Sequence, residues 1–256
     1  MVRKLVYAVR FLTVLPIPWR KEERLVDVAR SASLFPLVGL VVAVVAWGVG
    51  WLLSFAFGST VSRIGTLVAL VVFTGGLHLD GLADTADGVF GGRSAQQRLT
   101  IMRDSRIGSF GVLSIVLVLA LKGAVLVEMP AAALAAALLS AAVTARLAQV
   151  LLIAAFAAAR PDGLGVFFKE HLRGIDVAVS SVLTAAIVWS AGGLVATAVA
   201  AGAVGLGFLA AVWFAKRLGG LTGDVYGAVS EIVELLVLAA FAPFEIASRL
   251  GWVPQW

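Results

Sequence analysis

Long apolar runs separated by short polar segments dominate the chain. A helix needs roughly 17–25 mostly apolar residues to cross a bilayer. Seven runs approach or exceed this length, at residues 34–57, 61–77, 108–128, 131–158, 176–192, 193–214 and 225–243. The third and fourth runs meet at Glu128-Met129-Pro130, and the fifth and sixth meet at Gly192-Gly193. The pattern predicts an all-α integral membrane protein with about seven transmembrane helices.

The polar segments indicate how these helices are oriented. With the N-terminus placed in the cytoplasm, sixteen of the 20 Lys and Arg residues fall in cytoplasmic segments and two fall outside. Such an excess of Lys and Arg is typical of cytoplasmic loops, so the N-terminus is expected inside. Residues 1–33 are expected to include a short, partly amphipathic surface helix. Their apolar stretch is broken by Pro16 and Pro18 and does not resemble a cleaved signal peptide.

Composition supports the membrane assignment and excludes several kinds of function. Hydrophobic residues make up 61% of the chain, charged residues 14%, and the mean hydropathy is +1.03. One membrane-embedded domain over 1–256 is expected. The absence of cysteine excludes disulfides, thiolate metal sites and cysteine nucleophiles. The net charge of +5 does not indicate nucleic-acid binding, because the basic residues lie in short loops where they set topology.

The strongest candidate chemistry lies after the second run, in GGLHLDGLADTADGVFGG at 75–92. Helical spacing places Asp80, Asp84 and Asp87 within about 60° on one face. Such like charges repel each other, and the segment contains no Lys or Arg to neutralise them. Oxygen ligands on one face suit Mg²⁺, which also uses waters and substrate phosphates. The segment predicts an acidic, metal-binding cytoplasmic helix, with a solvated acidic face as the alternative.

His78 and a basic segment add further candidates. His78 points about 160° away from Asp80 on an ideal helix, so it is a candidate catalytic residue or an interface residue. The segment GGRSAQQRLTIMRDSRIGSFG at 91–111 follows directly. Arginine matches the geometry of phosphate oxygens. The candidate phosphate-binding residues are Arg103, Asp104 and Arg106, with Lys216 on the same predicted side.

A second acidic patch opens the last run, LGGLTGDVYGAVSEIVELL at 218–236. Asp224 and Glu231 share a helix face within about 20°, while Glu234 is displaced by about 80°. Carboxylates inside an apolar helix are costly and indicate function. The sequence pattern GGLxxD occurs at both 75–80 and 219–224, which favours two halves of the protein facing one site. Asp224 and Glu231 are therefore also candidate metal ligands.

Two basic residues lie inside apolar runs. Arg146 is a candidate partner of Glu231 or Glu234, and also a candidate substrate-binding residue. Lys122 is expected to extend its side chain to a membrane interface.

Several motifs together resemble the cobalamin synthase family, the adenosylcobinamide-GDP ribazoletransferases. They are HLDGLADTADG, IMRDSRIG and LGGLTGD-x₂-GA-x₂-E, with FLTVLPIP near the N-terminus, FPLVGL opening the first run, and DGLGVFF at 162–168. The resemblance runs nearly end to end. One departure is Val14, where the family often has Arg before Leu-Pro.

The resemblance implies an Mg²⁺-dependent enzyme of late vitamin B12 assembly at the inner membrane. Such an enzyme joins adenosylcobinamide-GDP to α-ribazole or its 5′-phosphate and releases GMP. The corrinoid nucleotide, α-ribazole and the lipid bilayer are then the expected partners, and a homo-oligomer is left open. Asp80, Asp84 and Asp87 would hold Mg²⁺ on the pyrophosphate, with Asp224 opposite. Asp84 or Asp87 would accept the proton of the attacking hydroxyl.

Other membrane proteins share parts of this pattern. Membrane prenyltransferases also carry DxxxD pairs, the spacing of Asp80 and Asp84. CDP-alcohol phosphotransferases begin with DG-x₂-AR, but Ala83 is followed here by Asp84. An ion-coupled transporter with Glu231, Glu234 and Arg146 as relay residues is a non-enzyme alternative.

Overall fold

The structure is a computed structural model and describes residues 2–18 and 25–242. Apart from an isolated bridge between Ala158 and Leu221, these residues contain only helices and their connections. The helices are α1 (Val2–Leu12), α2 (Leu25–Ser31), the 3₁₀-helix η1 (Ala32–Leu34), α3 (Phe35–Leu53), α4 (Ser59–Thr74), α5 (Leu77–Gly91), α6 (Ala95–Ile101), α7 (Ser109–Glu128), α8 (Ala131–Ala155), α9 (Leu164–His171), α10 (Gly174–Leu218) and α11 (Gly223–Phe241). The predicted all-α class is confirmed. Parts of two predicted segments, at residues 1, 19–24 and 243, lie outside the description.

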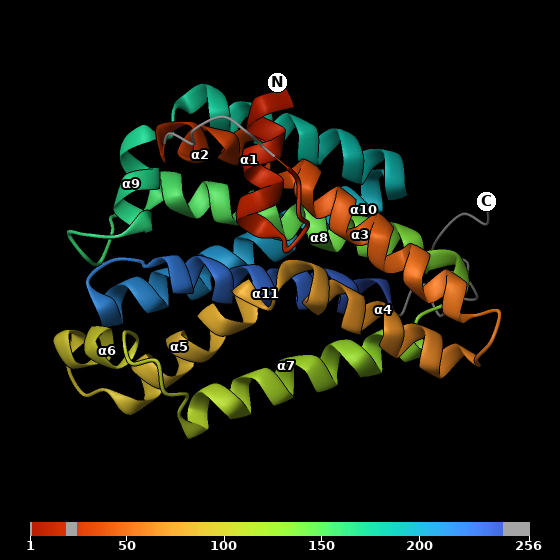
Figure 1. The fold of residues 1–256 in the computed structure, drawn as a ribbon, viewed down its shortest axis with the longest axis horizontal. Helices are drawn as coiled ribbons and strands as arrows, with labels where there is room; N and C mark the ends of the chain where they lie inside the picture. The colour runs from red at the N-terminus through yellow and green to blue at the C-terminus, as the bar shows by residue number, and fades with distance from the viewer. Residues whose placement is uncertain (1, 19–24, 243–256) are drawn as a thin grey trace.

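Helix α8 forms the centre of a bundle whose long helices follow the long axis of the molecule (Figure 1). It packs against α3, α10 and α11, and 78% of its most apolar window is buried. Small residues allow this close packing. A Cβ atom added at Gly39 of α3 would lie only 2.6 Å from the carbonyl oxygen of Ala142 in α8.

Within the described residues, four helical segments are long and apolar enough to cross a membrane. They are Val26–Leu53, which includes α3, and the helices α7, α8 and α10. Helices α4 and α5 are long and apolar enough to cross a membrane only when taken together, and the two are bent by 84° relative to each other. The predicted break between the fifth and sixth runs is confirmed, because Gly192 and Gly193 interrupt α10 with non-helical backbone angles. The structure thus supports several apolar spans, and the number seven stays a prediction.

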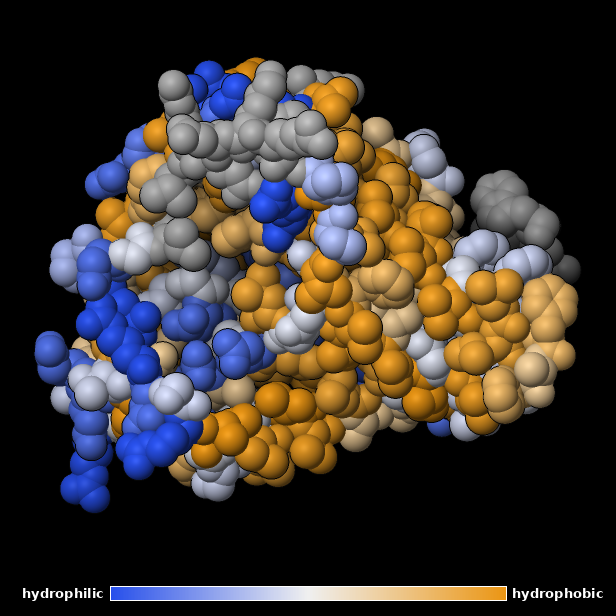
Figure 2. All heavy atoms as spheres, in the orientation of Figure 1, coloured by the Kyte–Doolittle hydropathy of each residue, from blue (hydrophilic) through white to orange (hydrophobic). Residues whose placement is uncertain are grey.

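The surface of the bundle has the character expected in lipid. Hydrophilic residues gather at the end that carries α6 and α9, while hydrophobic residues cover most of the remaining visible face (Figure 2). Only 28% of the apolar windows of α7 and α10 is buried. Exposed side chains on these helices include Leu113, Leu117, Leu121, Trp189 and Leu209. Because such an apolar surface is unfavourable in water, the chain is a membrane protein.

Helix α1 is present where an N-terminal surface helix is predicted, although its position at the membrane surface stays a prediction. One face, which includes Tyr7 and Leu12, is buried against the bundle. Lys4 donates to Asp176 at the start of α10, over 3.0 Å. Val14, the position of the family's arginine, has an exposed side chain and donates its backbone N–H to Phe73 at the end of α4. The N-terminal motif therefore lies against the junction of α4 and α5.

Candidate active site

The predicted acidic helix is present as α5, and two glycines determine its direction. Gly75 and Gly76 adopt left-handed φ angles of 62° and 69°. Residues with a Cβ atom are strained in this conformation, whereas glycine adopts it readily. The two glycines end α4 and start α5, which produces the bend between the helices. This turn directs the three aspartates away from the axis of α4.

Helix α5 crosses α11 at very short range. A Cβ atom at Gly81 would lie 2.7 Å from the carbonyl oxygen of Asp224, and one at Gly227 would lie 3.3 Å from the Cα atom of His78. The absence of side chains at both glycines lets the helix backbones touch. Asp80 and Asp224 consequently line the same cavity. The two GGLxxD segments thus contribute to one cavity, as their repeated pattern favoured.

The carboxylates at this crossing experience mutual repulsion. Asp84 is partly buried, and the negative charges of Asp224, Asp80 and Asp87 all act on it. Arg160, within the α8–α9 connection, only partly offsets this field. Its Nη1 atom lies 3.7 Å from Oδ2 of Asp224. Such uncompensated negative charge favours the binding of a cation.

Asp87 differs from the other two aspartates of α5, because each of its carboxylate oxygens accepts a backbone N–H. Its Oδ2 atom accepts the backbone N–H of Gly108 at 2.7 Å, and Oδ1 accepts that of Gly111 at 2.8 Å. Both donors belong to the N-terminus of α7, where free N–H groups and the helix dipole favour an anion. Asp87 thus holds α7 against α5.

We expect Gly111→Ala to weaken this anchor. The new Cβ atom would lie 2.4 Å from Oδ2 of Asp87, so the carboxylate must move and release its backbone donors. Charged hydrogen bonds contribute about 1.5–3 kcal/mol, and a loss of this size should appear as a lower midpoint of thermal unfolding. Gly48→Ala is the matched control, because a Cβ atom there has nothing within 4 Å. Equal midpoints for the two variants would contradict the anchoring role.

The predicted metal ligands do not form a ready-made cage. Among the described residues, no group of three or more His, Asp and Glu side chains is placed to hold a metal ion. Asp80, Asp84 and Asp224 gather at the crossing, but Glu231 lines a different cavity deeper along α11. Metal binding by these residues stays a prediction.

The predicted phosphate-binding residues lie on exposed segments, and most already have acidic partners. Arg103 donates to Asp162 over 2.8 Å. Arg106 bonds Asp104 through its side chain and its backbone, which lowers the pKa of that carboxyl to about 2. Lys216 is exposed in the last turn of α10. None of these contacts tests phosphate binding, which stays a prediction.

Arg146 lies in the interior, away from the exposed basic residues. It is 2% exposed, and its Nη1 atom donates to Ser230 of α11 over 2.9 Å. Its charge acts on Glu234 and Glu231, although the ion pairs of both glutamates are with Lys122. Its predicted role in substrate binding is not tested by these contacts.

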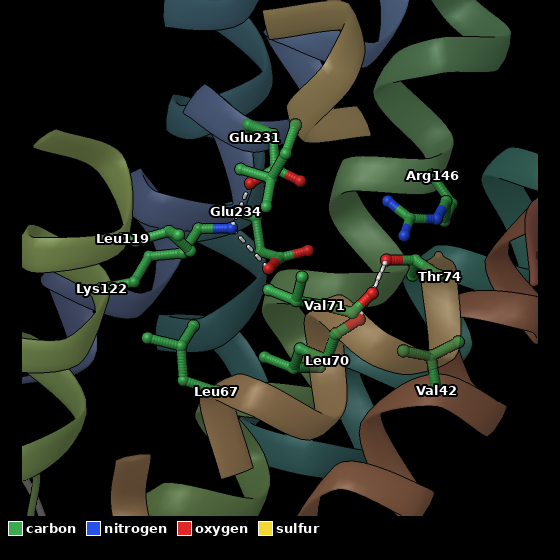
Figure 3. Close-up of a pocket in the computed structure, with 11 residues that line it drawn as sticks. Val42, Leu67, Leu70, Val71, Thr74, Leu119, Lys122, Arg146, Glu231 and Glu234 are labelled. Carbon is green, nitrogen blue, oxygen red and sulfur yellow. Dashed lines mark hydrogen bonds and ion pairs between the residues drawn. The ribbon is translucent and has the colours of Figure 1, made fainter. Parts of the chain in front are cut away.

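The expectation that Lys122 extends to a membrane interface is wrong. Lys122 is 2% exposed, and its Nζ atom donates to Glu231 and to Glu234, each over 2.7 Å (Figure 3). The two glutamates lie one turn apart on α11 and face α7, so one ammonium group bridges both carboxylates. Pairing with two buried acids outweighs the solvation that an interface would provide.

Sequence reasoning missed two sets of residues at the site. Arg160 entered only the charge count, although Arg-Pro-Asp-Gly directly after an apolar run is a signal for a residue held at a membrane surface. Three aromatic residues were also missed. Phe11, Phe35 and Phe168 line the cavity that contains Asp80 and Asp224. Their signal was present, because they belong to FLTVLPIP, FPLVGL and DGLGVFF.

Known proteins resemble the chain over most of its length. The chain is 43% identical over 235 residues to a protein of Roseiflexus sp. (strain RS-1), covering 91% of this chain and 86% of that protein. It is 38% identical over 238 residues to a protein of Geotalea daltonii, covering 93% and 96%. Both relatives are named adenosylcobinamide-GDP ribazoletransferase. No solved structure matches the chain.

A family model provides the same assignment over almost the whole chain. The model described as Cobalamin-5-phosphate synthase matches residues 4–242, which include both acidic helices and all three aromatic segments. The chain belongs to the Cobalamin-5-phosphate synthase family.

Proposed function

We propose that this chain joins the corrinoid of adenosylcobinamide-GDP to α-ribazole or its 5′-phosphate and releases GMP. The carrying observation is the family match over residues 4–242, together with the aspartates that α5 and α11 bring to one crossing. The enzyme is therefore a transferase of late cobalamin biosynthesis.

The reaction requires one new phosphorus–oxygen bond and the loss of another. A ribose hydroxyl of ribazole attacks the phosphorus atom that carries the corrinoid. The bond from this phosphorus to the bridging oxygen breaks, and GMP leaves with that oxygen. The hydroxyl proton needs an acceptor, and Asp84 is our candidate because it is partly buried among other carboxylates. Asp87 is the weaker candidate, since both its oxygens hold backbone N–H groups.

The donors at the crossing suit a magnesium ion. Asp80, Asp84 and Asp224 offer only oxygen, and they repel each other where no cation lies between them. A bound Mg²⁺ would supply charge neutralisation on the pyrophosphate. Such sites often use one or two carboxylates, with the remaining ligands from substrate phosphates and water. The few carboxylates at the crossing are therefore sufficient, because substrate phosphates and water would complete the coordination of the ion.

Cations at the hydrophilic end would hold the pyrophosphate. Arg160 already lies within 3.7 Å of Asp224, and Arg103 forms an exposed ion pair with Asp162. Exposed ion pairs contribute little to stability, so their arginines can exchange partners at low cost. Arg103, Arg106 and Lys216 are our candidates for contacting substrate phosphates. The predicted orientation places this end in the cytoplasm, at the cell inner membrane, with the active site facing the nucleotide pool.

The decisive experiment is an assay of purified protein in lipid with adenosylcobinamide-GDP, α-ribazole and Mg²⁺. We expect GMP and the ligated corrinoid to appear in equal amounts. Release of no GMP, with reaction of a prenyl or CDP-alcohol substrate instead, would overturn the assignment.

The same assay tests the metal. Removing divalent cations with EDTA should reduce turnover at least about 100-fold, because charge neutralisation of the pyrophosphate is lost. Adding back Mg²⁺ in excess should restore it. Undiminished turnover in EDTA would refute metal dependence, while the assignment of substrates would stand.

A further inference from the structure

A cavity of about 200 Å³ adjoins the acidic crossing. Its apolar part contains three phenylalanine rings from segments that lie far apart in the sequence. The ring centroids of Phe11 and Phe168 are 5.2 Å apart, and each is 6.0 Å from that of Phe35. Phe35 and Phe168 are almost completely buried. The three rings form an aromatic wall.

The lining of the cavity also includes two residues whose buried polar atoms lack partners. The hydroxyl of Tyr226 and the Nδ1 atom of His78 are buried, and neither has a hydrogen-bond partner among the described residues. These side chains are 6% and 3% exposed, respectively. Leaving such a group without a partner costs about 1–3 kcal/mol. Both atoms therefore favour a ligand that offers them hydrogen bonds.

We propose that this cavity binds the benzimidazole base of ribazole, and this inference rests on the proposed function. The base is a flat, methylated bicycle with one free ring nitrogen, which accepts a hydrogen bond in the ring plane. Its faces suit the aromatic wall, because aromatic rings favour stacked and tilted contacts. The Tyr226 hydroxyl donates to the ring nitrogen, and His78 lies beside it.

The size and polarity of the cavity select this base. An apolar cavity of about 150 Å³ accommodates benzene, so the larger volume here suits a bicycle. Guanine, a base of the corrinoid substrate, carries donors and acceptors along its whole edge. Within the cavity, the described uncharged polar side chains are His78, Gln149 and Tyr226. Because Asp80 and Asp224 are assigned to the pyrophosphate, few groups remain to pair with the edge of guanine. A methylated, mostly apolar base has no such requirement.

The cavity also places the sugar correctly. Asp80 and Asp224 line it together with the aromatic residues. A base held against Phe168 and Tyr226 directs its ribose towards these carboxylates. The attacking hydroxyl then lies beside the groups that accept its proton and bind the pyrophosphate. The aromatic wall acts in this way as a positioning element for the nucleophile.

The test uses free dimethylbenzimidazole, which lacks ribose and binds without turnover. Its affinity is measured by equilibrium dialysis of the full-length protein in nanodiscs. Tyr226→Phe removes only a hydroxyl without an internal partner, so the fold is kept, and binding should weaken about three- to tenfold. Gly165→Leu should abolish binding, because a Cβ atom at Gly165 already lies 3.7 Å from the Tyr226 ring. Phe208→Ala is the control, because Phe208 pairs with Phe156 outside the cavity. This variant should bind the base as tightly as the wild-type protein.

Steady-state kinetics separate this inference from the proposed function. In Tyr226→Phe the KM for α-ribazole should rise, while the KM for adenosylcobinamide-GDP stays unchanged. Unaltered binding of the free base in Gly165→Leu, or its displacement by GMP rather than by ribazole, would overturn the cavity assignment while GMP release continues. The cavity assignment would also be overturned if the wild-type protein did not bind the free base, for example because lipid occupied the cavity. Absence of GMP release with normal base binding would refute the proposed function alone.

Discussion

Asp84→Asn is expected to lower kcat by about 100- to 10,000-fold, the contribution typical of a general base. The amide has the size and shape of the carboxylate but does not accept a proton. It also removes one negative charge from the group formed with Asp80 and Asp224. The affinity for Mg²⁺ should therefore fall together with kcat. Folding should not suffer, because the substitution relieves repulsion among the carboxylates.

The measurement is GMP release in the reconstituted assay, with the unfolding midpoint as a check on the fold. Glu128→Gln is the matched control. It makes the same carboxylate-to-amide change on an exposed residue at the far end of α7. A 20-residue helix is about 30 Å long, so this change lies far from the crossing. Full activity of Asp84→Asn would show that the acidic face of α5 is only a solvated surface.

Helix type and the main features of the crossing follow from local sequence. The apolar runs are long, and their glycines mark the ends, so the break at Gly192 and Gly193 could be predicted. The repeated GGLxxD favoured two halves facing one site, and Asp80 and Asp224 do line one cavity. The helix ends depend on residues close together in the chain, whereas the meeting of Asp80 and Asp224 was indicated only by the repeated pattern.

The partners of individual charges could not be predicted in the same way. Asp87 has helical spacing with Asp80 and Asp84, yet its contacts are with backbone N–H groups more than twenty residues away. Whether a carboxylate faces solvent or a helix end depends on the packing of α7, which periodicity does not contain. The aromatic wall is a similar case, because three distant segments meet only after α1, α3 and α9 pack together.

Removal of the Lys122 charge is expected to have the largest effect on stability. Lys122 and Arg146 balance Glu231 and Glu234 in the bundle interior, so the four side chains together carry no net charge. Lys122→Met leaves one unbalanced carboxylate in a nearly dry environment. Breaking a buried ion pair in this way costs about 3–5 kcal/mol. For a protein of this size the unfolding midpoint should fall by about 6–20 °C.

A charge-balancing second substitution distinguishes electrostatics from lost packing. Lys122→Met combined with Glu231→Gln retains Glu234 and Arg146, which again sum to zero, so at least half of the lost stability should return. Lys216→Met, on an exposed lysine, should leave the unfolding midpoint unchanged and serves as the control. If the double variant is no more stable than Lys122→Met alone, the loss arises from the shape of the lysine side chain. A midpoint of Lys122→Met equal to that of wild type would instead mean that water reaches the two glutamates and replaces the ammonium group.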